Sequence, residues 1–366
     1  MYKAKWGLKL MDKYAKLWPN LSKLFAFIGV IVGFGGMLFV FCFLIIETWK
    51  FIITPGAEAA LKLIIPTVQI PGLPPLSFWH WIISIFLVAV VHEFSHGVVA
   101  RLYRVKIRSS GFAFLGPLLA AFVEPDEKGI QQLKKRKQLA IFAAGPFSNI
   151  VMAGIFLFLL FYVTTPLQGT MLDVNGIQVN ELMENYSLIE TGIETPFVLY
   201  KMNGLPIYEE NNFEDVILFL KDGDVITLGT DKGEYEVTAI QSPDDPNRAL
   251  VGMKDFRLSY AVKDDVSYLG SLPLAWPWIN LLILWIFLIS LGVGLFNLLP
   301  LGPIDGGRMF YTLLLGITHN ELHTRRIWTM VSWFCLLLIV INLLPLLNKL
   351  LIFLLQAVTI LISLTL

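Results

Sequence analysis

The sequence predicts a polytopic α-helical membrane protein with about six transmembrane helices, a re-entrant segment and a small inserted β-rich domain. The 366 residues are 56% hydrophobic and only 15% charged, and their mean hydropathy is +0.68, which is too apolar for a soluble domain. Long apolar stretches alternate with basic clusters, whereas residues 165–272 hold 19 acidic and seven basic residues. Because about 20 apolar residues cross a bilayer as a helix, the lipid bilayer is an expected partner and nucleic acid is not.

Composition divides the chain into four parts. Basic residues collect on the cytoplasmic side of membrane proteins, so the lysine-rich N-terminal segment is expected in the cytoplasm and the acidic insert on the opposite side. The parts are residues 1–23, the basic amphipathic segment; 24–164, spans 1–3 of the transmembrane core; 165–272, the extracytoplasmic insert; and 273–366, spans 4–6, of which the last two are expected at 327–344 and 350–366.

The second expected span, at about residues 78–103, carries the motif HEFSH from His92 to His96 in an otherwise apolar helix. Two histidines four residues apart lie on one helix face, with about 6 Å between their Cβ atoms, and can bind one metal ion. Glu93 can act as general base on a metal-bound water, as in the HExxH helix of zinc metalloproteases. Ionisable residues inside membrane helices are costly and usually functional, so this motif predicts a metal site.

A third metal ligand is expected from the run NLLPLGPIDGG, residues 297–307. Catalytic zinc sites use three protein ligands and leave a fourth position for water. Two prolines and three glycines break the membrane helix around Asp305, which makes this carboxylate the best candidate. The alternatives lie near membrane boundaries or beside a lysine-rich loop; they are His80, Glu124, Asp126, His319 and His323.

The stretch near residues 107–125 is apolar but contains Gly111, Gly116 and Pro117, so it is a poor helix. Irregular backbone at membrane depth is tolerated only where protein covers it or where it lines a cavity. A re-entrant hairpin directed toward the metal meets this condition, and a cytoplasmic surface loop is the alternative. Around Gly116 such a hairpin could bind an unwound substrate as an added strand.

Two asparagines are further candidates for substrate binding. Asn149 ends the run AGPFSN in the third span, and Asn297 begins the broken segment of the fourth. A helical substrate has its backbone carbonyls bonded internally and must unwind before water can attack. The two amides could bond to the freed backbone; alternatively, Asn149 bonds to a neighbouring helix.

The insert shows the alternation and turns of a β-rich domain. Strands are expected at residues 197–207, with a turn at Asn203-Gly204, and at 225–228 and 235–240 on either side of a turn at 231–233.

Together, the motifs HEFSH at 92–96, AGPFSN ending at Asn149 and NLLPLGPIDGG around Asp305 resemble those of the site-2 protease family of intramembrane zinc metalloproteases. The resemblance implies one zinc ion per chain bound by His92, His96 and Asp305, with Glu93 catalytic. It also implies regulated intramembrane proteolysis, in which single-span membrane proteins are cleaved within or near their transmembrane helices. The insert resembles the PDZ domain of many members in its position and strand pattern.

Two other classes of function remain open at this point. A transporter or channel that uses the His/Asp cluster as an ion path predicts paired broken helices in two repeated halves, and the sequence shows no such repeat. A non-catalytic protein that captures peptides and holds a structural metal has no need of the carboxylate of Glu93.

Overall fold

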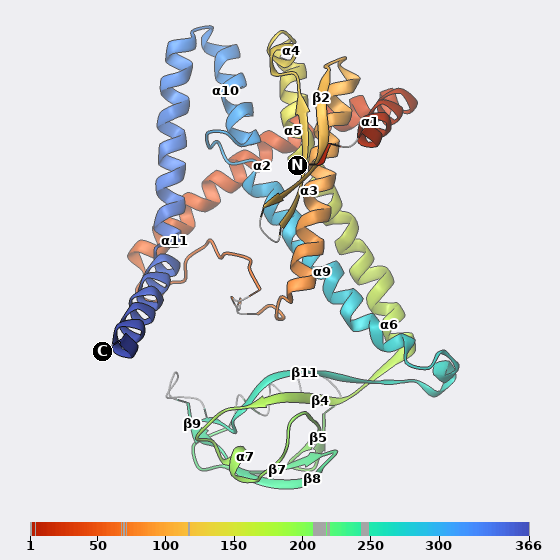
Figure 1. Ribbon diagram of the computed structural model, residues 1–366, viewed down its shortest axis with the longest axis vertical. Helices are drawn as coiled ribbons and strands as arrows, with labels where there is room; N and C mark the ends of the chain where they lie inside the picture. The colour runs from red at the N-terminus through yellow and green to blue at the C-terminus, as the bar shows by residue number, and fades with distance from the viewer. Residues whose placement is uncertain are drawn as a thin grey trace. The chain divides into compact units, whose positions relative to one another are not determined.

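The computed structural model describes the chain except for residues 1, 4, 67, 69, 71, 116–117, 208–216, 218–219, 243–248 and 366. The chain forms two compact units, Met1–Leu160 with Leu281–Leu366, and Phe161–Asn280. The first is mainly helical with one small sheet, and the second is mainly β-structure (Figure 1). The second unit contains the insert expected at residues 165–272.

The helices of the first unit follow the apolar stretches of the sequence. Five helical segments in the described part of the chain are long and apolar enough to cross a bilayer: Pro19–Ile53, Phe78–Leu102, Lys135–Met171, Leu272–Phe296 and Glu321–Asn348. The helices are α1 (Lys5–Leu17), α2 (Pro19–Ile53), α3 (Phe78–Leu102), α4 (Glu127–Gln131), α5 (Lys135–Leu159), α9 (Trp276–Phe296), α10 (Asp305–Thr318) and α11 (Glu321–Thr365).

The C-terminal helix differs from the prediction. Where two spans at 327–344 and 350–366 were expected, α11 runs unbroken from Glu321 to Thr365 with Pro345 inside it. Proline lacks an amide hydrogen and can bend a helix without ending it, and the leucines around it are strong helix formers. The described chain therefore has five helices of membrane length where six were predicted.

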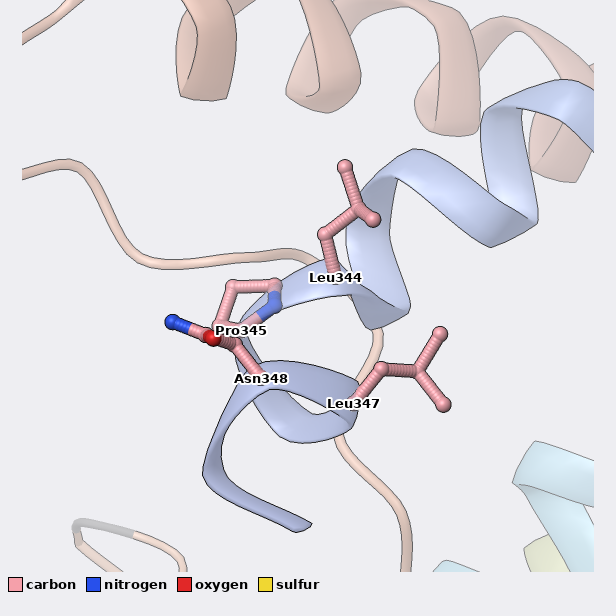
Figure 2. Close-up of a pocket in the computed structure, with 4 residues that line it drawn as sticks. All are labelled: Leu344, Pro345, Leu347 and Asn348. Carbon is pink, nitrogen blue, oxygen red and sulfur yellow. The ribbon is translucent and has the colours of Figure 1, made fainter. Parts of the chain in front are cut away.

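Pro345 marks a hollow on α11. It has a volume of about 470 Å³ and is lined by Leu344, Pro345, Leu347 and Asn348. Figure 2 shows Leu347 and the amide of Asn348 pointing to opposite sides of the helix. None of these lining residues is a candidate site residue.

Helix α5 lies at the centre of the first unit, where it packs against α2, α3 and α10. Its buried residues include a group of small side chains: Ala140, Ala143, Ala144, Gly145 and Ser148. Small residues allow helix backbones to approach closely in membrane proteins. Helix α5 thus packs against both α3, which carries His92 and His96, and α10, which begins at Asp305.

The predicted break before Asp305 is present, because α9 ends at Phe296 and α10 begins at Asp305. The chain between them folds back so that the Gly306 amide donates to the Asn297 carbonyl at 2.7 Å. A Cβ atom at Gly306 would lie 2.3 Å from two backbone carbonyl oxygens, and one at Gly307 would lie 2.4 Å from two others. The two glycines after Asp305 are therefore required by close backbone packing.

The stretch expected to be re-entrant is an antiparallel hairpin of β2 (Ile107–Leu115) and β3 (Leu118–Pro125). A short strand, β1 (Tyr2–Lys3), pairs with β2 on the other side, so β3 is an edge strand of this sheet. Strand β3 packs against α3, the helix that carries the HEFSH motif. Gly116, the candidate substrate-binding residue of this hairpin, lies outside the described residues.

The second unit is built on a six-stranded antiparallel sheet in the order β11-β4-β5-β7-β8, with β6 paired to β5. Asn203 and Gly204 join β5 to β6 with positive φ angles of 48° and 74°, as an Asn-Gly turn requires. The strands predicted in this region are confirmed. The sheet consists of β4 (Leu172–Leu182), β5 (Phe197–Met202), β6 (Leu205–Pro206), β7 (Val225–Thr230), β8 (Gly233–Thr238) and β11 (Met253–Val262).

Shorter elements complete the second unit around a buried apolar core. Phe197, Leu199 and Leu228 belong to this core and are at most 1% exposed. The shorter elements are a π-helical turn (Leu160–Thr164), α6 (Thr165–Met171), α7 (Ser187–Glu190), the strand pair β9 (Ile240–Gln241) and β10 (Ala249–Leu250), and two 3-10 turns (Asp264–Leu269 and Leu272–Ala275).

Candidate metal centre

Three potential metal ligands converge in the helical unit. His92 and His96 are one turn apart on α3, and Asp305 is the first residue of α10. The Nε2 atoms of the two histidines are 3.2 Å apart, and the Oδ2 atom of Asp305 lies 3.1 Å from Nε2 of His92 and 3.2 Å from Nε2 of His96. The three side chains are 11%, 13% and 14% exposed. Two imidazole nitrogens and one carboxylate oxygen form the donor set that zinc prefers in catalytic sites.

The Nδ1 atom of His96, which faces away from the ligand cluster, has the hydrogen bond that is usual for a metal-binding histidine. Its Nδ1 atom lies 2.7 Å from the carbonyl oxygen of Ile141 in α5. A carbonyl can only accept a hydrogen bond, so Nδ1 carries the proton and donates it. The lone pair of Nε2 is then free for a metal ion, and the ring is fixed in orientation.

Asn149 occupies the equivalent position behind His92. It is 0% exposed, its Nδ2 atom lies 3.1 Å from His92 Nδ1, and its Oδ1 atom has no partner among the described residues. A 180° flip of the Asn149 amide exchanges Oδ1 and Nδ2 without changing the shape of the side chain. Oδ1 then accepts the proton on Nδ1 of His92, and the lone pair on Nε2 of His92 is free. Asn149 thus contacts a neighbouring helix, the alternative to a substrate contact, and both histidines fit a metal.

We expect Asn149→Leu to weaken metal binding by about 10–100-fold, the usual effect of removing a group that orients a metal-binding histidine. Asn149→Asp keeps an acceptor for the Nδ1 proton and is expected to retain most of the affinity. Metal content of the purified protein, titrated against a chelator, measures both variants. Equal losses in Asn149→Leu and Asn149→Asp would contradict this role.

Gly145 of α5 lies directly beside the ligand atoms. A Cβ atom built there would be 2.3 Å from Nε2 of His96 and 2.6 Å from Nε2 of His92. These distances are far below van der Waals contact, so any side chain at this position displaces the imidazoles or fills the space between them. The AGPFSN run therefore contributes a glycine that keeps the metal position open.

Gly145→Ala is accordingly expected to reduce bound metal at least about tenfold, because a ligand displaced by about 1 Å loses its geometry. Gly154→Ala on the same helix is the matched control, since a Cβ atom there meets nothing within 4 Å. Elemental analysis after purification gives the metal content of both variants. A metal-loaded Gly145→Ala protein would show that the imidazoles bind their ion from another side.

Glu93 is held at the junction of α3 and the hairpin. Its Oε2 atom accepts a hydrogen bond from the backbone amide of Val123 in β3, with an N–O distance of 3.0 Å. The carboxylate is fixed by a group that no side-chain pattern in the sequence could have indicated, because any residue at position 123 other than proline supplies the same amide.

The other candidate residues named from the sequence do not belong to the cluster of His92, His96 and Asp305. Glu124 accepts a hydrogen bond from Ser109 Oγ at 2.7 Å, and Asp126 pairs with Arg108 at 2.6 Å. Asn297 is half-buried at the break before α10. The ring of His80 contacts the hydroxyl of Ser77. His319 and His323 are exposed near the turn between α10 and α11.

A centre of this kind on helices of membrane length is typical of membrane-embedded metalloproteases. The model of Peptidase family M50 matches residues 80–339, a range that includes the three potential ligands and Glu93. The chain belongs to this family, and the resemblance to the site-2 protease family is confirmed. Its membership and its apolar helices together make it an integral membrane protein and a metallopeptidase.

Two individual proteins are similar to this chain over different lengths. Uncharacterized protein MJ0971 of Methanocaldococcus jannaschii is 27% identical over 322 residues, which cover 83% of this chain and 74% of that protein. The crystal structure of the PDZ domain of an SdrC-like protein from Listeria monocytogenes is 13% identical, covers 25% of this chain and 92% of that chain, and gives a TM-score of 0.19. At this TM-score the second likeness is no guide to the fold.

Proposed function

We propose that this protein is an intramembrane zinc metalloendopeptidase that hydrolyses peptide bonds within or near the transmembrane helices of single-span membrane proteins. The observation that carries the proposal is the convergence of His92, His96 and Asp305 beside Glu93. Each histidine has an acceptor available behind its ring, so both Nε2 atoms can face one ion. A structural metal site would have no use for the adjacent glutamate.

The residues of the centre have different roles in the proposed hydrolysis. His92, His96 and Asp305 would hold one zinc ion, which supplies a water of lowered pKa and polarises the scissile carbonyl. Glu93 accepts a proton from the attacking water and returns it to the leaving amine. The Val123 amide holds the carboxylate of Glu93 in place through this transfer.

The substrate must be extended for this chemistry, because helical carbonyls are hydrogen-bonded to their own chain. Strand β3 is an edge strand, and the Val123 amide points away from β2, toward Glu93. We propose that the unwound segment pairs with this edge as an added strand, with Gly116 and Asn297 assisting it. In this scheme Asn149 orients the ring of His92 through a hydrogen bond, and we favour this role over a direct contact with substrate.

The proposed topology follows from charge. The lysine-rich N-terminus faces the cytoplasm and the acidic, PDZ-like insert faces the opposite side. Cleavage of the substrate would then release a segment on one side of the membrane, as regulated intramembrane proteolysis requires.

Cleavage of a single-span test substrate by the purified full chain tests the proposal. In detergent or vesicles, hydrolysis is expected to stop on addition of a chelator and to return with added zinc. Helix-breaking residues in the substrate span are expected to accelerate cleavage, whereas a polyleucine span is expected to resist it. Cleavage that persists in the chelator would overturn the proposal.

A further inference from the structure

The N-terminal helix α1 packs against α3, the helix that carries the HEFSH motif. Its buried face includes Met11, 3% exposed, and Ala15, 7% exposed. Met11 lies against Gly97 of α3, where an added Cβ atom would be 2.4 Å from its sulfur. An ion pair of 3.1 Å between Asp12 and Arg101 joins the same two helices. Because α1 is fixed on one side, its other residues have definite surroundings.

A second face of α1 is basic and exposed. Lys9, Lys13 and Lys16 follow one another at spacings of four and three residues, which places them in one stripe along the helix. All three are exposed, and in the described part of the chain none of them joins an ion pair. The stripe is a row of three cationic groups available to an anionic ligand.

A third face is apolar and equally exposed. Tyr14 is 41% exposed, Leu17 is 56% exposed and Trp18, just after the helix, is 51% exposed. An amphipathic helix with lysines on one flank and aromatic and aliphatic residues on the next is suited to the boundary between lipid headgroups and acyl chains.

The apolar face continues into a groove. Its volume is about 200 Å³, and it is lined by Tyr14, Trp18, Leu21 and Phe25 on one side and by Phe94 and Val98 of α3 on the other. Tyr14 meets Phe94 edge to face, with 5.8 Å between ring centroids. The groove is smaller than the roughly 300–1,000 Å³ of pockets for whole drug-sized ligands, so it suits part of an acyl chain.

We propose that this groove binds one acyl chain of an anionic phospholipid, whose phosphate is held by Lys9, Lys13 and Lys16. Charge complementarity selects this occupant, since an uncharged lipid or an apolar protein helix would leave the lysine row without a counter-charge. The site adjoins the HEFSH motif, because Phe94 and Ser95 both line the groove. A bound lipid therefore contacts the helical turn that carries His92 and His96.

Native mass spectrometry of the full chain with added phosphatidylglycerol or phosphatidylcholine tests the proposal. The wild type is expected to retain one phosphatidylglycerol in preference to phosphatidylcholine. Lys9→Gln/Lys13→Gln/Lys16→Gln should lower its apparent affinity at least about tenfold, since each lysine near an anionic lipid contributes to binding. Ser22→Trp, which fills the groove from α2, should lower it with all three lysines in place.

Lys134→Gln/Lys135→Gln/Arg136→Gln removes the same charge from another exposed cluster and is the matched control. Unchanged phosphatidylglycerol binding in this control supports a defined site. Equal retention of the two lipids by the wild type, or equal losses in both triple variants, would overturn it. In vesicles, p-benzoylphenylalanine at Leu21 should crosslink to a lipid on illumination; a crosslink to a single-span substrate instead would also overturn the proposal.

Discussion

Glu93→Gln is expected to lower the rate of peptide hydrolysis by about 10²–10⁴-fold, the usual contribution of a general base. Glutamine keeps an oxygen that can accept the hydrogen bond from the Val123 amide, so the side chain should remain in position. It cannot take a proton from water at neutral pH. Metal content should stay at the wild-type level, because Glu93 is not one of the three clustered ligands. Initial cleavage rates and elemental analysis of the same preparation measure both quantities.

Asp126→Asn provides the matched control for this carboxylate. Asp126 pairs with Arg108 and was an alternative ligand on sequence grounds, so its amide variant should keep both rate and metal. Full activity in Glu93→Gln would eliminate the glutamate as the base. Loss of metal in that variant would instead make Glu93 a ligand and require a different base.

Asp305→Ala is expected to have the largest effect on the metal itself. Removing a direct ligand should weaken binding by more than the roughly 10–100-fold associated with a supporting residue. Cleavage should fall with it, since the remaining imidazoles of His92 and His96 cannot complete a three-ligand site. Zinc content after dialysis against graded chelator concentrations gives the affinity, and the cleavage assay gives the rate.

The zinc affinities of Asn149→Leu and Asp126→Asn are the comparison values for Asp305→Ala. Zinc binding by Asp305→Ala should be weaker than by Asn149→Leu and far weaker than by Asp126→Asn. An Asp305→Ala protein that keeps its zinc would move the third ligand to another residue and would remove the basis for placing α10 in the centre.

The three clustered residues of the centre could be predicted from sequence, because local patterns mark each of them. The HEFSH motif places His92 and His96 on one helix face whatever surrounds them. Prolines and glycines mark the break before Asp305, and the Asn203-Gly204 turn marks a strand boundary in the insert. In each case the residue types constrain the backbone directly.

The supporting groups could not be predicted, because they depend on contacts between distant segments. The Val123 amide and the Ile141 carbonyl are backbone atoms without a sequence signature. For Asn149 the sequence left a substrate contact and a bond to a neighbouring helix open, and its amide lies against His92 of α3. Pro345 was expected to fall between two spans, although a proline alone does not decide whether a helix bends or ends.

The hydrogen bond between the Val123 amide and the Glu93 carboxylate also joins the hairpin of β2 and β3 to α3. The base sits on a rigid helix, but the direction of its carboxylate depends on a strand that belongs to a separate hairpin. A displacement of the hairpin would therefore turn the carboxylate of Glu93, whereas the three clustered ligand residues lie on α3 and α10.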